Sequence, residues 1–173
     1  MPHQNWSQAD STPDFEVVKE VIGRPMELLL IEDSLTSARL LMGVLKQQQL
    51  QHRLTWLTDG DEAVEFLWRR GKFSKAPRPD LVLLDLGLPG KDGREILAEL
   101  RRDEQLHALP VVVMTASTDE TDRMQSLSLE VEAYLVKPID VKNFSKLLIG
   151  LKSFWQNDQV QPMVNGLYDL PGI

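Results

Sequence analysis

Four apolar residues run directly into a carboxylate in the stretch LVLLDLGLP, residues 81–89. A nearly continuous hydrophobic run of this length is typical of a strand that is covered on both faces of a parallel sheet. The carboxylate of Asp85 then lies at the end of a buried strand, which is costly unless a cation or hydrogen bonds compensate it. This stretch therefore predicts both a central parallel strand and a polar site at its carboxyl end.

Further apolar runs lie on both sides of this strand, and segments with helical periodicity separate them. The other predicted strands are residues 26–31, 54–57, 111–114 and 133–136. The predicted helices cover residues 34–48, begin at Asp59 and at Asp92, and then cover about residues 119–129 and 140–155. Such alternation is typical of βαβ units. We therefore predict an α/β fold of the flavodoxin-like, doubly wound (βα)5 type, with five parallel strands in the order 2-1-3-4-5.

Length and composition favour one compact domain with additional residues at both ends. The chain has 173 residues, of which 42% are hydrophobic. Residues 1–25 are mostly polar and are predicted to be a mobile N-terminal arm. The domain is then expected to span residues 26–155, followed by an extended C-terminal tail at residues 156–173.

The charge of the chain and the residue types that it lacks exclude several classes of protein. A net charge of −7 opposes nucleic-acid binding, because phosphate contacts need a basic surface. No apolar run approaches the roughly 20 residues that span a bilayer, so we expect no membrane association. The absence of cysteine excludes disulfides and thiolate metal sites, and it fits the reducing cytoplasm, which is the localisation that we predict.

Polar residues follow four of the five predicted strands. Glu32 and Asp33 follow the first strand, Asp85 the third, Thr115 the fourth and Lys137 the fifth. All except Asp85 have a plain structural alternative: the acidic pair could cap a helix, the threonine could satisfy backbone groups, and the lysine could lie on the surface. Because ligands bind beyond the carboxyl ends of parallel strands, the shared edge predicts one binding crevice instead.

The residue types in this crevice point to phosphoryl transfer. Three carboxylates close together repel one another, and Mg²⁺, which prefers oxygen ligands, would compensate their charge. With such a cation and Lys137 in place, a carboxylate oxygen of Asp85 can attack a phosphoryl donor and become an aspartyl phosphate. The Thr115 hydroxyl and the Lys137 ammonium could then each bind a phosphoryl oxygen.

Several motifs, in this order and spacing, resemble the receiver domain of bacterial two-component response regulators. The resemblance covers about residues 26–155 and is carried by the motifs IED (31–33), LLDLGLP (83–89), DG (92–93), MTA (114–116) and YLVKP (134–138). It implies a phosphorelay protein whose phosphoryl donor is a sensor histidine kinase and whose output is a change in protein contacts.

The resemblance implies roles for individual residues around the metal. It makes Asp85 the phosphoacceptor, and it gives the Mg²⁺ ligands as Glu32, Asp33, Asp85 and the backbone carbonyl of Gly87. Gly87 departs from the polar residue that related proteins often carry at this position. The departure bears on the lifetime of the phosphorylated state, since side chains at Gly87 and at Ser117 would flank the attacking water.

The resemblance also implies a conformational switch. It makes Thr115 and Tyr134 the switch pair, and it makes Lys137 the lysine that contacts the phosphate, joined to Pro138 by a cis peptide bond. We expect Thr115 to move toward the phosphate and Tyr134 to rotate into the space that it vacates.

A narrower resemblance is to the stand-alone regulators that are paired with phytochrome-type histidine kinases. It rests on residues 71–80, 92–97 and 153–155. It implies a red-light-sensing kinase as donor and a homodimer formed through the fourth helix, fifth strand and fifth helix. Leu147 and Phe154 are the candidate dimer contacts, because they lie off the predicted core stripe of the last helix, which consists of Phe144, Leu148, Leu151 and Trp155.

We therefore predict a single-domain response regulator, since too few residues follow Lys137 for an output domain of normal size. Its phosphorylation and dephosphorylation would be self-catalysed, so it would not be a turnover enzyme, and its downstream partner is not identified by the sequence. The main alternative is a receiver-like binding module that acts without phosphorylation. A metal-dependent phosphatase would need a second aspartate at Gly87, and Glu32 and Asp33 would repel the phosphate of a flavin.

Overall fold

The computed structural model describes residues 25–48, 51–155, 163–164 and 167–168 of the chain. Five strands form one parallel sheet: β1 (Met26–Ile31), β2 (His52–Leu57), β3 (Leu81–Leu84), β4 (Val111–Thr115) and β5 (Ala133–Val136). They lie in the order β2-β1-β3-β4-β5. This order confirms the predicted flavodoxin-like topology, with β1 and β3 adjacent at the centre of the sheet.

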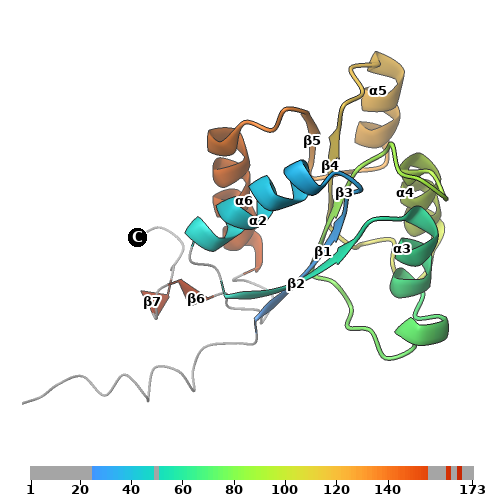
Figure 1. Cartoon of the computed structure of the whole chain (residues 1–173), viewed down its shortest axis with the longest axis horizontal. Helices are drawn as coiled ribbons and strands as arrows, with labels where there is room; N and C mark the ends of the chain where they lie inside the picture. The colour runs from blue at the N-terminus through green and yellow to red at the C-terminus, as the bar shows by residue number, and fades with distance from the viewer. Residues whose placement is uncertain (1–24, 49–50, 156–162, 165–166, 169–173) are drawn as a thin grey trace, which may run out of the picture.

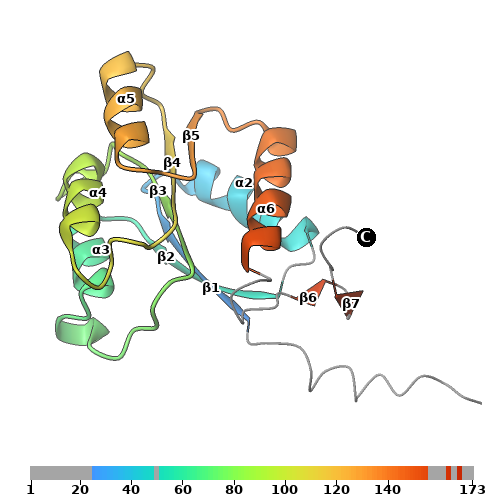
Figure 2. The same ribbon diagram turned by 180° about the vertical axis from the view of Figure 1, so that it is seen from behind.

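Five helices connect and follow the strands: α2 (Leu35–Gln47), α3 (Gly60–Leu67), α4 (Gly93–Arg102), α5 (Glu120–Ser128) and α6 (Val141–Trp155). A short 3-10 helix, η1 (Gly71–Phe73), follows α3. Helices α2 and α6 cover one face of the sheet, while α3 and α4 cover the other, with α5 beside α4 near β5 (Figure 1, Figure 2). The carboxylates of Asp59, Asp92 and Asp119 accept backbone hydrogen bonds at the starts of α3, α4 and α5.

Strand β3 is buried on both faces, as its sequence predicts. Leu81 and Leu83 point into the hydrophobic cluster under α2 and α6, and Val82 and Leu84 point into the cluster under α3 and α4. The predicted stripe of α6 also packs inward, since Phe144, Leu148 and Leu151 are all buried. The sheet and its two helical layers therefore give a rigid frame for the residues that follow each strand.

Strand and helix boundaries match the predicted ranges closely. Strand β2 begins at His52, two residues before its predicted start, and β4 continues through Thr115. The first of these differences has a physical reason: β2 is an edge strand that is mostly half-buried, so polar residues belong to it.

The predicted arm and tail fall mostly outside the described residues. In the tail, β6 (Met163–Val164) pairs with β7 (Leu167–Tyr168) in an antiparallel register. The side chains of Phe154 and Trp155 also lie outside the described residues. Within the part of the chain that is described, no helix has the length and apolar character needed to cross a membrane.

Candidate functional site

The polar residues that follow the strands meet at the carboxyl edge of the sheet. Lys137 Nζ lies 2.8 Å from Glu32 Oε1, 2.7 Å from Glu32 Oε2 and 2.9 Å from Asp85 Oδ2. One carboxylate oxygen from each of Glu32, Asp33 and Asp85 falls within 4.8 Å of the other two. The structure therefore assembles the acidic cluster and its lysine from β1, β3 and β5.

The backbone fixes Asp85 at the floor of this site. Its amide donates to Ile31 O (3.0 Å), which continues the β1–β3 pairing by one residue beyond the strand. The loop after β3 then returns over it, since Gly93 N donates to Leu86 O (3.0 Å). A Cβ at Gly93 would lie 2.3 Å from the Asp85 carbonyl oxygen, so any larger residue would displace this loop.

Glu32 is fully buried, at 0% exposure, and burial shapes its electrostatics. Its Oε1 atom accepts a further hydrogen bond from Ser34 N (2.9 Å), and its carbonyl accepts one from Trp56 Nε1 (2.7 Å). Burial raises the pKa of the Glu32 carboxyl above its ordinary value, although the hydrogen bond from Lys137 opposes this. Burial lowers the pKa of Lys137, but its hydrogen bonds to Glu32 and Asp85 outweigh this effect and leave the pKa raised.

The donor set fits a hard divalent cation. Three carboxylates lie together and only one ammonium group, that of Lys137, contacts two of them, which leaves two negative charges without compensation when all four groups are ionised. Glu32 Oε2 is buried beside Lys137 and accepts no hydrogen bond of good geometry from the residues that the structure describes. An all-oxygen set with spare electron pairs and excess negative charge suits Mg²⁺ or a similar ion.

The side of Asp85 that faces Gly87 is open. Asp85 is only 5% exposed, and its Oδ1 atom accepts a hydrogen bond from Gly87 N (3.0 Å). Gly87 itself is exposed, and a Cβ added there would lie 3.9 Å from that oxygen. The two carboxylate oxygens are thus held differently, one by a backbone amide and the other by Lys137.

The two predicted switch residues both contact Ser117. Thr115 is 2% exposed at the end of β4, and its Oγ1 atom accepts a hydrogen bond from Ser117 N (3.2 Å). The Tyr134 hydroxyl donates to Ser117 O (3.2 Å), and burial raises its pKa. The peptide bond between Lys137 and Pro138 is cis, which confirms that prediction.

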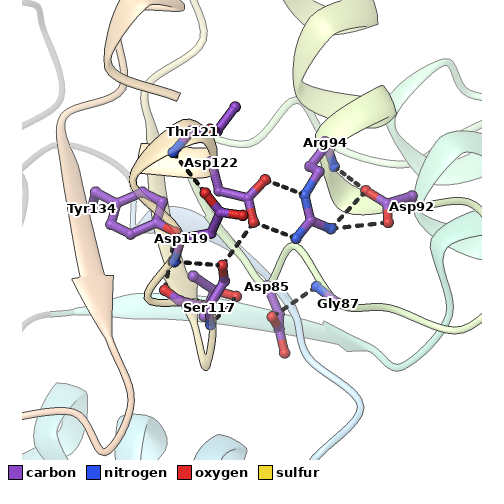
Figure 3. Close-up of polar contacts among 10 residues, drawn as sticks. Asp85, Gly87, Asp92, Arg94, Ser117, Asp119, Thr121, Asp122 and Tyr134 are labelled. Carbon is purple, nitrogen blue, oxygen red and sulfur yellow. Dashed lines mark hydrogen bonds and ion pairs between the residues drawn. The ribbon is translucent and has the colours of Figure 1, made fainter. Parts of the chain in front are cut away.

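An ionic cluster that the sequence did not reveal lies beside the switch residues (Figure 3). Arg94 Nε and Nη2 each lie 2.6 Å from an oxygen of Asp122, and Arg94 Nη1 lies 3.1 Å from Asp92 Oδ2. Ser117 Oγ donates to the same Asp122 carboxylate (2.7 Å). The hydrogen bonds from Arg94 and then from Ser117 hold the pKa of Asp122 at about 2.

The predicted dimer contacts lie on α6. Leu147 is half-buried and packs against the hydrophobic cluster between α6 and the sheet. Large apolar residues are exposed on the three elements of the predicted interface, namely Met124 and Leu127 on α5, Val136 on β5 and Ile149 on α6. The homodimer remains a prediction.

Known proteins share this fold and much of this sequence. The family described as "Response regulator receiver domain" matches residues 28–149. The response regulator Rcp1 of Synechocystis sp. is 45% identical over 131 residues, which are 76% of this chain and 89% of that protein.

Solved structures give the same relationship. The Mn²⁺-bound form of Rcp1 has a TM-score of 0.67 at 44% identity, covering 78% of this chain and 96% of that one. The phosphorylated cyanobacterial phytochrome response regulator RcpA has a TM-score of 0.67 at 37% identity, covering 77% and 95%. The matched family covers well over half of the residues, and Rcp1 spans most of the same range. This chain therefore belongs to the response regulators that are built on a receiver domain.

Proposed function

We propose that Asp85 accepts a phosphoryl group from a sensor histidine kinase, with Mg²⁺ bound by Glu32, Asp33, Asp85 and the carbonyl of Gly87. The observation that carries this proposal is the position of Asp85. It is a nearly buried carboxylate at the carboxyl edge of a parallel sheet, 2.9 Å from Lys137 and inside a cluster of oxygen donors.

The chain's own groups prepare Asp85 for attack. Gly87 N binds Oδ1 and Lys137 binds Oδ2, so the carboxylate plane is fixed before a donor arrives. One oxygen forms a bond to phosphorus while the phosphorus–nitrogen bond of a phosphohistidine breaks and the imidazole leaves. A bound divalent ion would neutralise charge on the transferring oxygens. The product is an acyl phosphate on Asp85.

After transfer, Thr115 and Lys137 are the groups that would sense the phosphoryl oxygens. Each hydrogen bond to a charged group contributes about 1.5 to 3 kcal/mol. Two such bonds approach the roughly 5.5 kcal/mol that moves a two-state equilibrium from 1:99 to 99:1. Tyr134 would then rotate as Thr115 moves, and the surface formed by α5, β5 and α6 would change.

The partners follow from the same proposal. The matched proteins include regulators named for phytochromes, so we propose a phytochrome-type kinase as donor. We also propose a homodimer through α5, β5 and α6, with Leu147 and Phe154 as contacts; the exposed apolar residues on these elements support it. The absence of cysteine supports a cytoplasmic setting.

The protein would not be a turnover enzyme, because the group that is phosphorylated is its own Asp85 carboxylate, and the acyl phosphate must be hydrolysed before Asp85 can react again. A binding module that acts without phosphorylation is the alternative. It leaves the excess negative charge around Asp85 without a role, and the experiment below separates it from the proposal.

The test is the mass of the intact protein after incubation with acetyl phosphate, with and without Mg²⁺. Wild type should gain one phosphoryl group only when Mg²⁺ is present, and Asp85→Asn should gain none. Asp140→Asn is the matched control. Asp140 is an exposed residue at the start of α6, where its side chain accepts a backbone hydrogen bond as a helix cap, and asparagine can fill the same role. Addition to Asp85→Asn, or no addition to wild type with any donor, would refute the proposal.

A further inference from the structure

Ser117 joins the switch residues to helix α5. Its backbone amide donates to Thr115 Oγ1 (3.2 Å), and its carbonyl accepts from the Tyr134 hydroxyl (3.2 Å). Its own hydroxyl donates to Asp122 Oδ2 (2.7 Å) and accepts from Asp119 N (3.2 Å). Every polar group of this one residue is therefore engaged, and each engages a different part of the switch region.

Arg94 anchors this arrangement to the rigid part of the domain. Its guanidinium binds both oxygens of Asp122 at 2.6 Å, a two-point contact that fixes the orientation of the carboxylate. Arg94 lies in the first turn of α4, whose residues Ile96, Leu97 and Leu100 are buried in the core. Figure 3 shows the Asp122 carboxylate between Arg94 on one side and Ser117 on the other.

The proposed switch conflicts with this arrangement. If the Thr115 hydroxyl moves to a phosphoryl oxygen on Asp85, the Ser117 amide loses its acceptor, and Ser117 must move to find another. Movement of Ser117 would separate its hydroxyl from Asp122, because two hydrogen bonds from Arg94 hold that carboxylate in place. The resting position of the β4–α5 loop is thus stabilised by groups that lie outside the phosphorylation site.

We propose that Arg94, Asp122 and Ser117 form a latch that holds the β4–α5 loop in its resting conformation and that phosphorylation of Asp85 opens it. This inference rests on the proposed function, because it concerns the regulation of the same site. The latch keeps its charge across the physiological range, since the pKa of Asp122 is about 2. It sets how much of the protein already occupies the switched conformation before phosphorylation.

Opening the latch by mutation should therefore speed phosphorylation. Ser117→Ala removes the hydroxyl that donates to Asp122, and Arg94→Gln removes the guanidinium that binds both oxygens of Asp122. Each variant should show an initial rate of labelling by acetyl phosphate, at saturating Mg²⁺, about three- to tenfold higher than wild type, because a larger fraction of the protein is preorganised. Ser117→Thr keeps the hydroxyl and should restore a rate close to that of wild type.

Arg123→Gln is the matched control. Arg123 lies on α5 next to Asp122 and, like Arg94, forms an ion pair, with Glu120 at 3.2 Å, but both side chains are exposed and the pair is local to the helix. Its labelling rate should equal that of wild type. Equilibrium unfolding of each variant is measured alongside, because a merely structural role would lower stability without raising the rate.

The double variant Arg94→Gln/Ser117→Ala makes the test specific to the latch. Both changes act through Asp122, so the double variant should be no faster than the faster single variant. Multiplied effects, or latch variants that label at or below the wild-type rate, would overturn the latch. Failure of wild type itself to label would instead refute the proposed function, so the two failures are distinguishable.

Discussion

Two ionic clusters lie close to the β4–α5 loop, and in each of them the pKa of a carboxyl group is shifted, but in opposite directions. Around Lys137, burial raises the pKa of Glu32, and one ammonium group contacts two of three clustered carboxylates. Around Arg94, hydrogen bonds lower the pKa of Asp122 to about 2. The difference shows that the first cluster still needs positive charge, which a metal ion can supply, whereas in the second both oxygens of Asp122 already accept hydrogen bonds from Arg94 and Ser117.

The largest expected effect on stability comes from removing the positively charged side chain of each cluster. Lys137→Met leaves two buried carboxylates without their partner and should cost about 3 kcal/mol of metal-free stability, the low end for a broken buried pair because Lys137 is 17% exposed. Mg²⁺ should restore part of this loss. Arg94→Met should cost only about 1 kcal/mol, since the Arg94 side chain is 39% exposed, and Mg²⁺ should not change that cost.

Urea denaturation with and without Mg²⁺ measures these free energies of unfolding. The stabilisation by Mg²⁺ is the informative quantity: it should be larger for Lys137→Met than for wild type, because the lysine no longer competes for the carboxylates. Equal costs for both variants, each insensitive to Mg²⁺, would erase the distinction between the clusters.

The carboxyl groups of Asp122 and Glu32 should also contribute to the stability of the fold with opposite dependences on pH. A lowered pKa means that ionised Asp122 stabilises the fold above its ordinary pKa of 3.8 and that this stability is lost as the pH falls toward about 2. Asp122→Asn should therefore be less stable than wild type at pH 7, by about 1 kcal/mol after screening by solvent, and the deficit should shrink below about pH 4.

Glu32→Gln should show the reverse. Because the pKa of Glu32 is raised above 4.5, the folded state favours the neutral form, and ionisation of this group destabilises the metal-free fold as the pH rises. The neutral variant should be the more stable protein at pH 7 without metal, and its advantage should vanish in acid. Stability curves from pH 2 to 8 that move in parallel for both variants would contradict the comparison.

The sequence predicted the first cluster because its position follows from topology alone. The parallel strands end at one edge, so the residues after Ile31, Leu84 and Val136 had to meet there. The apolar run of β3 likewise fixed its boundaries, since a strand buried on both faces leaves no ambiguity. Strand β2 was less clear because half-buried edge strands mix polar and apolar residues.

The second cluster could not be predicted in this way. Arg94 and Asp122 are 28 residues apart on different helices, and their contact depends on how α4 and α5 pack. Each residue also has a local explanation, because a charged side chain near a helix start is ordinarily solvated. Only Ser117 could be singled out from the sequence, because it lies two residues after the switch threonine. That position did not indicate which group its hydroxyl would contact.

The smallest expected effect concerns the open side of Asp85. Gly87→Asn places a polar side chain beside Oδ1, where a Cβ would lie 3.9 Å away and meet nothing closer. It should lengthen the half-life of the phosphorylated protein by about threefold, less than 1 kcal/mol in the barrier, because the side chain hinders the attacking water. Loss of the added mass after removal of acetyl phosphate measures this half-life. Gly87→Ala separates bulk from polarity, and an unchanged half-life in both variants would show that water reaches the phosphoryl group from another side, such as that of Ser117.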